Sequence, residues 1–290
     1  MIKPSSFNDC FIRWALDLVG EEHKSRTISF DGKTVNSTGK MANYKKPLHI
    51  VSGHFAELGI TLGQKAVSDK SNEIPAVREL IELLDVKGCM VVADALNCQI
   101  KTTETIIERG GDYLLSVKGN QSNLETEIKD FVEDESLRKT MNKAVRVEKN
   151  RERIEKRIAY VTSEIEWLFS KEEWSNLASI GAINTQFETS KGKTNEWHYF
   201  ISSRKLTAEE LLKYSRLEWF VETMHWLLDV HFSEDFFRVS NQNTQESLNI
   251  IRKIVLNLIR DYKNEHALKK PFSGLLFDCL LNPHNIIKFF

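Results

Sequence analysis

Short apolar runs separated by polar residues dominate the first 120 positions, and one of them ends abruptly at an acid. In GCMVVADALNCQ, residues 88–99, the five side chains from Cys89 to Ala93 are apolar. Such a run is typical of a strand that is buried on both faces. Because an unpaired carboxylate is costly to bury, we expect Asp94 either to cap the helix that follows or to hold a cation.

The surrounding pattern predicts a mixed α/β fold. Strands that come first as a meander and then alternate with helices indicate a mixed sheet covered by helices. Apolar side chains that recur every three or four residues mark the helices. We expect a helix over about 5–19, strands over 26–31 (ending at Asp31), 48–54 and 59–66, a helix over 72–85, the strand to Asp94, a helix over 99–109, a strand over 111–121 and a helix over 122–134.

Residues 138–203 follow a different pattern, which predicts a β-rich insertion. Two stretches, 143–149 and 153–162, alternate polar and apolar residues as the strands of a hairpin do, and 178–188 and 196–203 are also expected to be strands. From Thr207 the pattern is mostly helical to the end of the chain. No low-complexity linker separates these parts, so we expect the insertion to interrupt one domain.

The stretch RLEWFVETMHWLLDVHFSED, residues 216–235, carries two stripes at the helical period. The apolar stripe is predicted to face the core and consists of Leu217, Phe220, Val221, Met224, Leu227 and Leu228. The second stripe consists of Glu218, Glu222, His225 and Asp229. Its carboxylates repel one another unless solvent or a cation screens them. A solvated surface is the ordinary explanation for such a stripe, and a metal site is the alternative.

Composition narrows the class of protein. The 290-residue chain has a formal net charge of −1, which gives no overall basic bias. Its four cysteines form no C-x-x-C pair, which argues against structural zinc. No apolar run approaches the roughly 18 residues of a membrane span. The GKT at 192–194 lacks the glycine that a phosphate-binding loop needs, since Phe187 stands there. We expect a cytoplasmic protein that uses no nucleotide cofactor and contacts no membrane.

Asp31, Asp94 and the acidic helix together suggest a metal site. In a mixed sheet, the two aspartates would stand at the ends of strands that could be neighbours. Two aspartates and a glutamate form an all-oxygen ligand set, which suits Mg²⁺ or Mn²⁺. Two such ions, about 3.5–4 Å apart, can clamp the attacking and leaving oxygens of a phosphodiester.

The chain resembles a known family in several stretches that occur in the expected order. They are FDGKT (30–34), LGQKAVSDKSNEI (62–74), ADALNCQ (93–99), DYLLSVKGNQ (112–121), ETMHWLLDVHFSED (222–235) and SLNIIRKIVLNLI (247–259). As a set, they are similar to the H-repeat-associated insertion-sequence transposases. These are enzymes of the DDE type, named for their Asp-Asp-Glu triad.

This resemblance implies a ribonuclease H-like fold, with a five-stranded mixed sheet flanked by helices. It assigns catalysis and metal binding to Asp31, Asp94 and Glu222, with Mg²⁺ or Mn²⁺ as cofactor, and a pair of ions is expected, as in the two-metal mechanism. It also implies cleavage and strand transfer of DNA in a bacterial cell, by a homodimer on DNA. Expected domains are a remnant of an N-terminal region (1–25), the catalytic domain (26–260) and a C-terminal helical tail (261–290).

Candidate DNA contacts include basic and polar side chains in the predicted hairpin and near the acids. An ordinary solvated strand edge, a simple turn, a surface histidine or core packing of the tryptophan would explain the same residues. The expected DNA-binding residues are Lys118, Asn120, Gln121, Arg146, Lys149, Arg151, Arg153, Arg157, Arg216, His225, Trp226 and Arg238.

Two alternatives to an active transposase remain at this point. Motif positions that differ from the family pattern, such as Val35 in place of its usual arginine, would also fit a DNA-binding remnant without catalysis. An unrelated phosphohydrolase could use the same acids.

Overall fold

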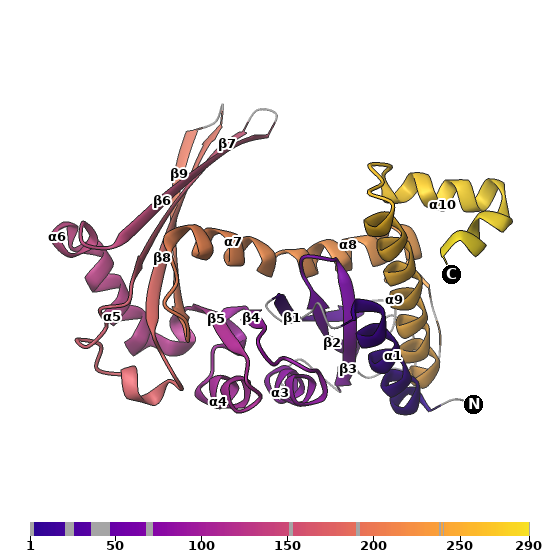
Figure 1. Cartoon of the computed structure of the whole chain (residues 1–290), viewed down its shortest axis with the longest axis horizontal. Helices are drawn as coiled ribbons and strands as arrows, with labels where there is room; N and C mark the ends of the chain where they lie inside the picture. The colour runs from indigo at the N-terminus through magenta and orange to yellow at the C-terminus, as the bar shows by residue number, and fades with distance from the viewer. Residues whose placement is uncertain are drawn as a thin grey trace. The chain divides into compact units, whose positions relative to one another are not determined.

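The computed structural model describes residues 3–20, 26–35, 47–67, 72–150, 153–189, 192–237, 239 and 241–289 (Figure 1). The chain forms two compact units. The first comprises Met1–Leu84 and Trp219–Phe290, and the second comprises Asp85–Glu218. The boundaries of these units differ from those of the domains expected at 1–25, 26–260 and 261–290. The expected division into three domains stays a prediction.

The first unit contains an antiparallel meander in which β2 (Leu48–Phe55) pairs with both β1 (Thr27–Val35) and β3 (Ile60–Val67). Every residue of β2 is buried, so helices cover both faces of this sheet. The helix α3 (Glu73–Leu83) covers one face. On the other face lie α8 (Phe220–Phe232) and α9 (Gln242–Glu265), and α1 (Pro4–Val19) packs against β3 and α9.

The prediction that the first strand ends at Asp31 is wrong. The strand β1 continues to Val35, and Asp31 lies inside it, opposite Ser52 of β2. A strand tolerates such charges when they share a face and find partners there. Asp31 and Lys33 are two residues apart and therefore point to the same face, where α8 supplies a histidine and a carboxylate.

The C-terminal helices of the first unit pack around one apolar cluster. Val221, Met224, Leu227 and Leu228 of α8 contact Leu256 and Ile259 of α9 and Phe272 and Leu275 of α10 (Phe272–Leu281). A 3₁₀ helix, Pro283–Phe289, follows α10. The predicted core stripe is therefore correct for these four residues of α8. It is wrong for Phe220, which is 42% exposed. The predicted acidic stripe is also interrupted, because Glu218 ends a separate helix, α7 (Ala208–Glu218), before α8 begins.

In the second unit, β4 (Met90–Ala93) runs parallel to β5 (Asp112–Val117), and α4 (Ile100–Glu108) connects them. Two helices, α5 (Ser122–Glu133) and α6 (Glu135–Arg138), follow β5. The meander β6 (Asn142–Asn150), β7 (Arg153–Thr162), β8 (Ser179–Thr189) and β9 (Gly192–Ser202) then joins β5 through an antiparallel pairing with β9. In Figure 1 the two hairpins of this meander extend beyond β5.

The predicted fold class is confirmed: an antiparallel meander is followed by parallel strands with connecting helices, and a β-rich insertion precedes α8. The apolar run at 89–93 is fully buried, as its composition predicts. In the described part of the chain, no helix is both long and apolar enough to cross a bilayer.

Candidate active site

Asp31 belongs to a row of polar side chains that crosses the sheet of the first unit. It lies opposite Ser52, which in turn lies opposite Gln64 of β3. Directly opposed residues point to the same face of a sheet. From α8, the Nδ1 atom of His225 approaches to 3.4 Å from Oδ2 of Asp31.

Glu222 lies one turn before His225 on α8, so both side chains are on the same stripe of the helix. The stripe is the one that faces β1, because His225 contacts Asp31 and Asp229 contacts Lys33. Glu222 is exposed. Its carboxylate has neither a hydrogen bond nor an ion pair within the described residues, which leaves its oxygens available to a ligand.

Lys33 forms an ionic cluster immediately beside Asp31. Its ammonium contacts Asp229 and lies 2.7 Å from Oε2 of Glu234, whose side chain is only 1% exposed. Burial alone would lower the pKa of Lys33, but the carboxylates of Glu234 and Asp229 outweigh this effect, so its pKa is raised. Oxygens of Asp229, Glu234 and Asp235 lie within 4.8 Å of one another. Lys33 supplies the cation for this cluster.

A second lysine is buried under the polar row. Lys253 of α9 donates hydrogen bonds of 2.7 Å to Oγ of Ser52 and to Oε1 of Gln64. Burial lowers its pKa to about 7, although Glu234 partly opposes this shift. Burial, followed by the charges of Lys253 and Lys33, also lowers the pKa of His225 well below its usual value. The imidazole beside Asp31 is therefore neutral near pH 7.

Asp94 belongs to the second unit, where it directly follows β4. Its Oδ1 accepts hydrogen bonds from the backbone N–H of Asn97 at 3.3 Å and from Nδ2 of Asn97 at 3.0 Å. Asp94 thus caps the short helix Ala95–Asn97, one of the two roles that the sequence allows. Its other oxygen, Oδ2, accepts no hydrogen bond from the described residues. The cap therefore leaves half of the carboxylate free.

Asn120 and Gln121 hold the segment that follows Asp94. Nδ2 of Asn120 donates to the carbonyl oxygen of Ala95 at 2.7 Å, and Nε2 of Gln121 donates to that of Cys98 at 2.9 Å. These amides were expected to contact DNA, and the structure gives their nitrogens an internal role. Lys118, just before them, is exposed.

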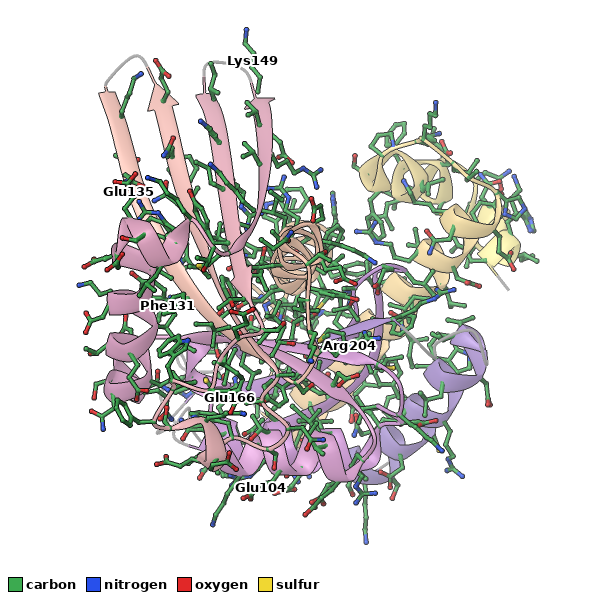
Figure 2. All side chains as sticks on the ribbon, turned by 60° about the vertical axis from the view of Figure 1, so that its left-hand side comes forward. Glu104, Phe131, Glu135, Lys149, Glu166 and Arg204 are labelled. Atoms are coloured by element: carbon green, nitrogen blue, oxygen red, sulfur yellow. The ribbon has the colours of Figure 1, made fainter. Side chains whose placement is uncertain are left out.

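The predicted basic hairpin is partly neutralised from within. Nε of Arg146 lies 2.8 Å from Glu148, and Arg216 of α7 lies 2.6 Å from the other oxygen of Glu148. Arg157 donates to Oγ of Ser215 at 2.9 Å, and burial lowers its pKa. Lys149 is exposed near the free end of the hairpin (Figure 2).

Three further predicted contacts cannot be placed, because Arg151, Arg238 and the side chain of Arg153 lie outside the described residues. The side chain of Trp226 is 56% exposed and that of Trp219 is 63% exposed, so core packing does not account for either of them. His225 is mostly buried against Asp31, so it is not the surface histidine that the sequence also allowed.

Sequence reasoning gave Lys33 and Glu234 no role at this site, and it did not foresee the buried contacts of Lys253. The two-residue spacing from Asp31 to Lys33 gives a signal, since it places both on one face of a strand. No comparable signal marks Lys253, whose partners Ser52 and Gln64 are about 200 positions away in sequence.

The carboxylates fit a hard divalent cation. Asp31, Asp94 and Glu222 supply only oxygen, the donor that Mg²⁺ prefers. Glu222 and Oδ2 of Asp94 carry no hydrogen bond from the described residues, and the histidine beside Asp31 is neutral. The donor chemistry of these three side chains is therefore the kind that a hard divalent cation accepts.

Comparison with known protein families identifies the class of this protein as a transposase. Residues 22–258 match the family described as the transposase DDE domain, and the chain belongs to this family. It is 32% identical over 273 residues to the H repeat-associated putative transposase YhhI of Escherichia coli K12, covering 90% of this chain and 71% of that relative. The resemblance found in the sequence is thereby confirmed.

Two further similarities belong beside this one. The putative transposase YncI of Escherichia coli O157:H7 is 31% identical over 265 residues, covering 89% of this chain and 68% of that relative. A solved structure of the piggyBac transposase synaptic complex with hairpin DNA has 8% identity and a TM-score of 0.49. That similarity covers 83% of this chain and 47% of the piggyBac chain.

Proposed function

We propose that this chain cleaves DNA strands and transfers them for an insertion sequence, with Asp31, Asp94 and Glu222 as its catalytic carboxylates. The observation that carries this proposal is the approach of α8 to β1. His225 contacts Asp31, and Glu222 lies one turn away on the same stripe of that helix. Membership of the transposase family supports the reaction class.

In this proposal, the three carboxylates hold two Mg²⁺ ions. When bound, such a pair activates water or a DNA 3′-hydroxyl and stabilises the leaving 3′-oxygen. The residues of this chain contribute placement and charge. Neutral His225 orients Asp31 without offsetting its charge. The hydrogen bond from the backbone N–H of Asn97 to Asp94 fixes the carboxylate of Asp94 at the end of β4.

DNA is the proposed substrate and partner. Exposed Lys118 and Lys149 are available for phosphate contacts, which position a nucleic acid without reading its sequence. Trp219 and Trp226 expose large aromatic surfaces on which an unpaired base could stack. The homodimer on DNA remains a prediction.

Nicking of supercoiled plasmid in Mg²⁺ or Mn²⁺ tests the proposal. We expect the wild-type chain to nick, and Asp31→Asn, Asp94→Asn and Glu222→Gln each to lose nicking while still binding DNA. Glu218→Gln is a matched control, because it removes an acid only four positions from Glu222. Binding without any nicking by the wild type would instead favour the non-catalytic remnant.

A further inference from the structure

A pocket of about 90 Å³ opens in the first unit between α8, α9 and the turn that joins β2 to β3. Its apolar walls include Phe220 and Leu256. Its polar side chains include Thr223 of α8, and Arg260 and Asn264 of α9. An aromatic ring needs more room, since a cavity that holds benzene measures about 150 Å³. The pocket therefore suits a small polar group.

Arg260 is a half-buried cation that lines this pocket. Among the described residues, its guanidinium has no hydrogen bond and no ion pair. Burial lowers the pKa of Arg260, and no acid opposes that shift. A desolvated guanidinium is costly unless an anion compensates it.

Within the described lining, the guanidinium packs against a glycine and forms no ion pair with an acid. A Cβ atom added to Gly59 would lie 3.4 Å from both Cδ and Nε of Arg260, so the side chain lies directly against this glycine. Glu57 is the acid in the lining, but both of its oxygens accept hydrogen bonds from the backbone N–H of Thr27, at 3.1 and 3.0 Å. His54, also in the lining, is neutral, since burial lowers its pKa to about 3.

The pocket lies on a different side of α8 from Glu222. Phe220, Thr223 and Leu227 line it, and their spacing places them on one face of the helix, roughly opposite the stripe of Glu222 and His225. A helix with its side chains is about 10–12 Å wide. Roughly three nucleotides of one strand span that distance, at about 3.4 Å each. The pocket and the stripe of Glu222 are therefore separate surfaces of α8.

We propose that this pocket is an anion subsite in which Arg260 binds a phosphate group, with Thr223 and Asn264 at its sides. The phosphate belongs to the DNA backbone, and this part rests on the proposed function. A free phosphate ion offers the same chemistry, so the experiment separates the two sources.

Binding of a random-sequence DNA duplex by the full chain, followed by fluorescence anisotropy, is the first measurement. A hydrogen bond to a charged group typically strengthens an interaction about tenfold or more, so Arg260→Gln should weaken binding by about that factor. Arg260→Lys keeps the charge and loses the planar fork, and an intermediate loss is expected. The control is Lys101→Gln on α4, which removes one exposed positive charge and should change affinity less than about twofold.

Inorganic phosphate is the second probe, read as a shift in melting temperature against chloride at equal ionic strength. Stabilisation of the wild type, but not of Arg260→Gln, supports the subsite even if DNA binding is unchanged, and then assigns it to free phosphate. Equal DNA affinities for Arg260→Gln and Lys101→Gln, with no phosphate-specific shift, would overturn the proposal. Neither measurement requires cleavage, so failure of the subsite is distinguishable from failure of the catalytic proposal.

Discussion

Nδ1 of His225 lies 3.4 Å from Oδ2 of Asp31, which ties α8 to the strand that carries the first carboxylate of the proposed triad. The imidazole is neutral, because burial and then the charges of Lys253 and Lys33 lower its pKa. A neutral partner can orient a carboxylate while leaving its full charge for a cation. We therefore propose that His225 positions Asp31, and its expected contact with DNA stays a prediction.

Replacement of His225 should lower the apparent affinity for Mg²⁺ in nicking more than it lowers the affinity for DNA. Groups that orient metal ligands typically contribute about 10–100-fold to metal affinity or activity. We expect His225→Ala to raise the Mg²⁺ concentration for half-maximal nicking about tenfold or more, with unchanged affinity for DNA. His225→Asn, which retains a donor, should recover part of the loss. An unaltered Mg²⁺ dependence in His225→Ala would exclude the positioning role.

Removal of Lys33 should destabilise the protein. Glu234 is almost fully buried, and Lys33→Met would remove the ammonium that lies 2.7 Å from its carboxylate. Such losses cost about 3–5 kcal/mol. Denaturation in urea measures the free energy of unfolding, and Lys129→Met, from an exposed pair with Glu133, provides the control at about 0–1 kcal/mol. Equal effects of the two substitutions would show that the cluster contributes little.

The low pKa of Lys253 predicts a pH-dependent contribution to stability. Its pKa is about 7 in the folded state, against 10.5 as its ordinary value. Between these values the unfolded chain binds more protons, so stability from this group rises with pH, by at most about 1.4 kcal/mol per unit. The difference in unfolding free energy between wild type and Lys253→Met should therefore increase in favour of wild type from about pH 7 to 10. A difference that is constant over this range would contradict the assignment.

Much of the fold follows from local patterns, while several features of the site depend on distant partners. The apolar run before Asp94 and the periodicity of α8 predict a buried strand and a core stripe, and both are found. The continuation of β1 beyond Asp31 depends on β2 and α8, which supply partners that the local sequence does not reveal.

The same limit explains the basic hairpin and the acidic stripe. Spacing alone does not show that Glu148 lies between Arg146 and Arg216, since one of these arginines belongs to a helix about 70 positions away. Nor does the helical period reveal that a break separates Glu218 from Glu222.

The most direct test of the catalytic proposal exchanges a ligand atom and follows the metal preference of cleavage. Asp94→Cys places sulfur where the proposal has an oxygen ligand. Mg²⁺ binds sulfur poorly, whereas Mn²⁺ accepts softer ligands more readily. With supercoiled plasmid, we expect this variant to lose nicking in Mg²⁺ and to regain part of it in Mn²⁺, while Asp94→Ala stays inactive in both. Nicking by Asp94→Ala at the wild-type rate in Mg²⁺ would contradict the assignment of Asp94 and with it the proposed triad.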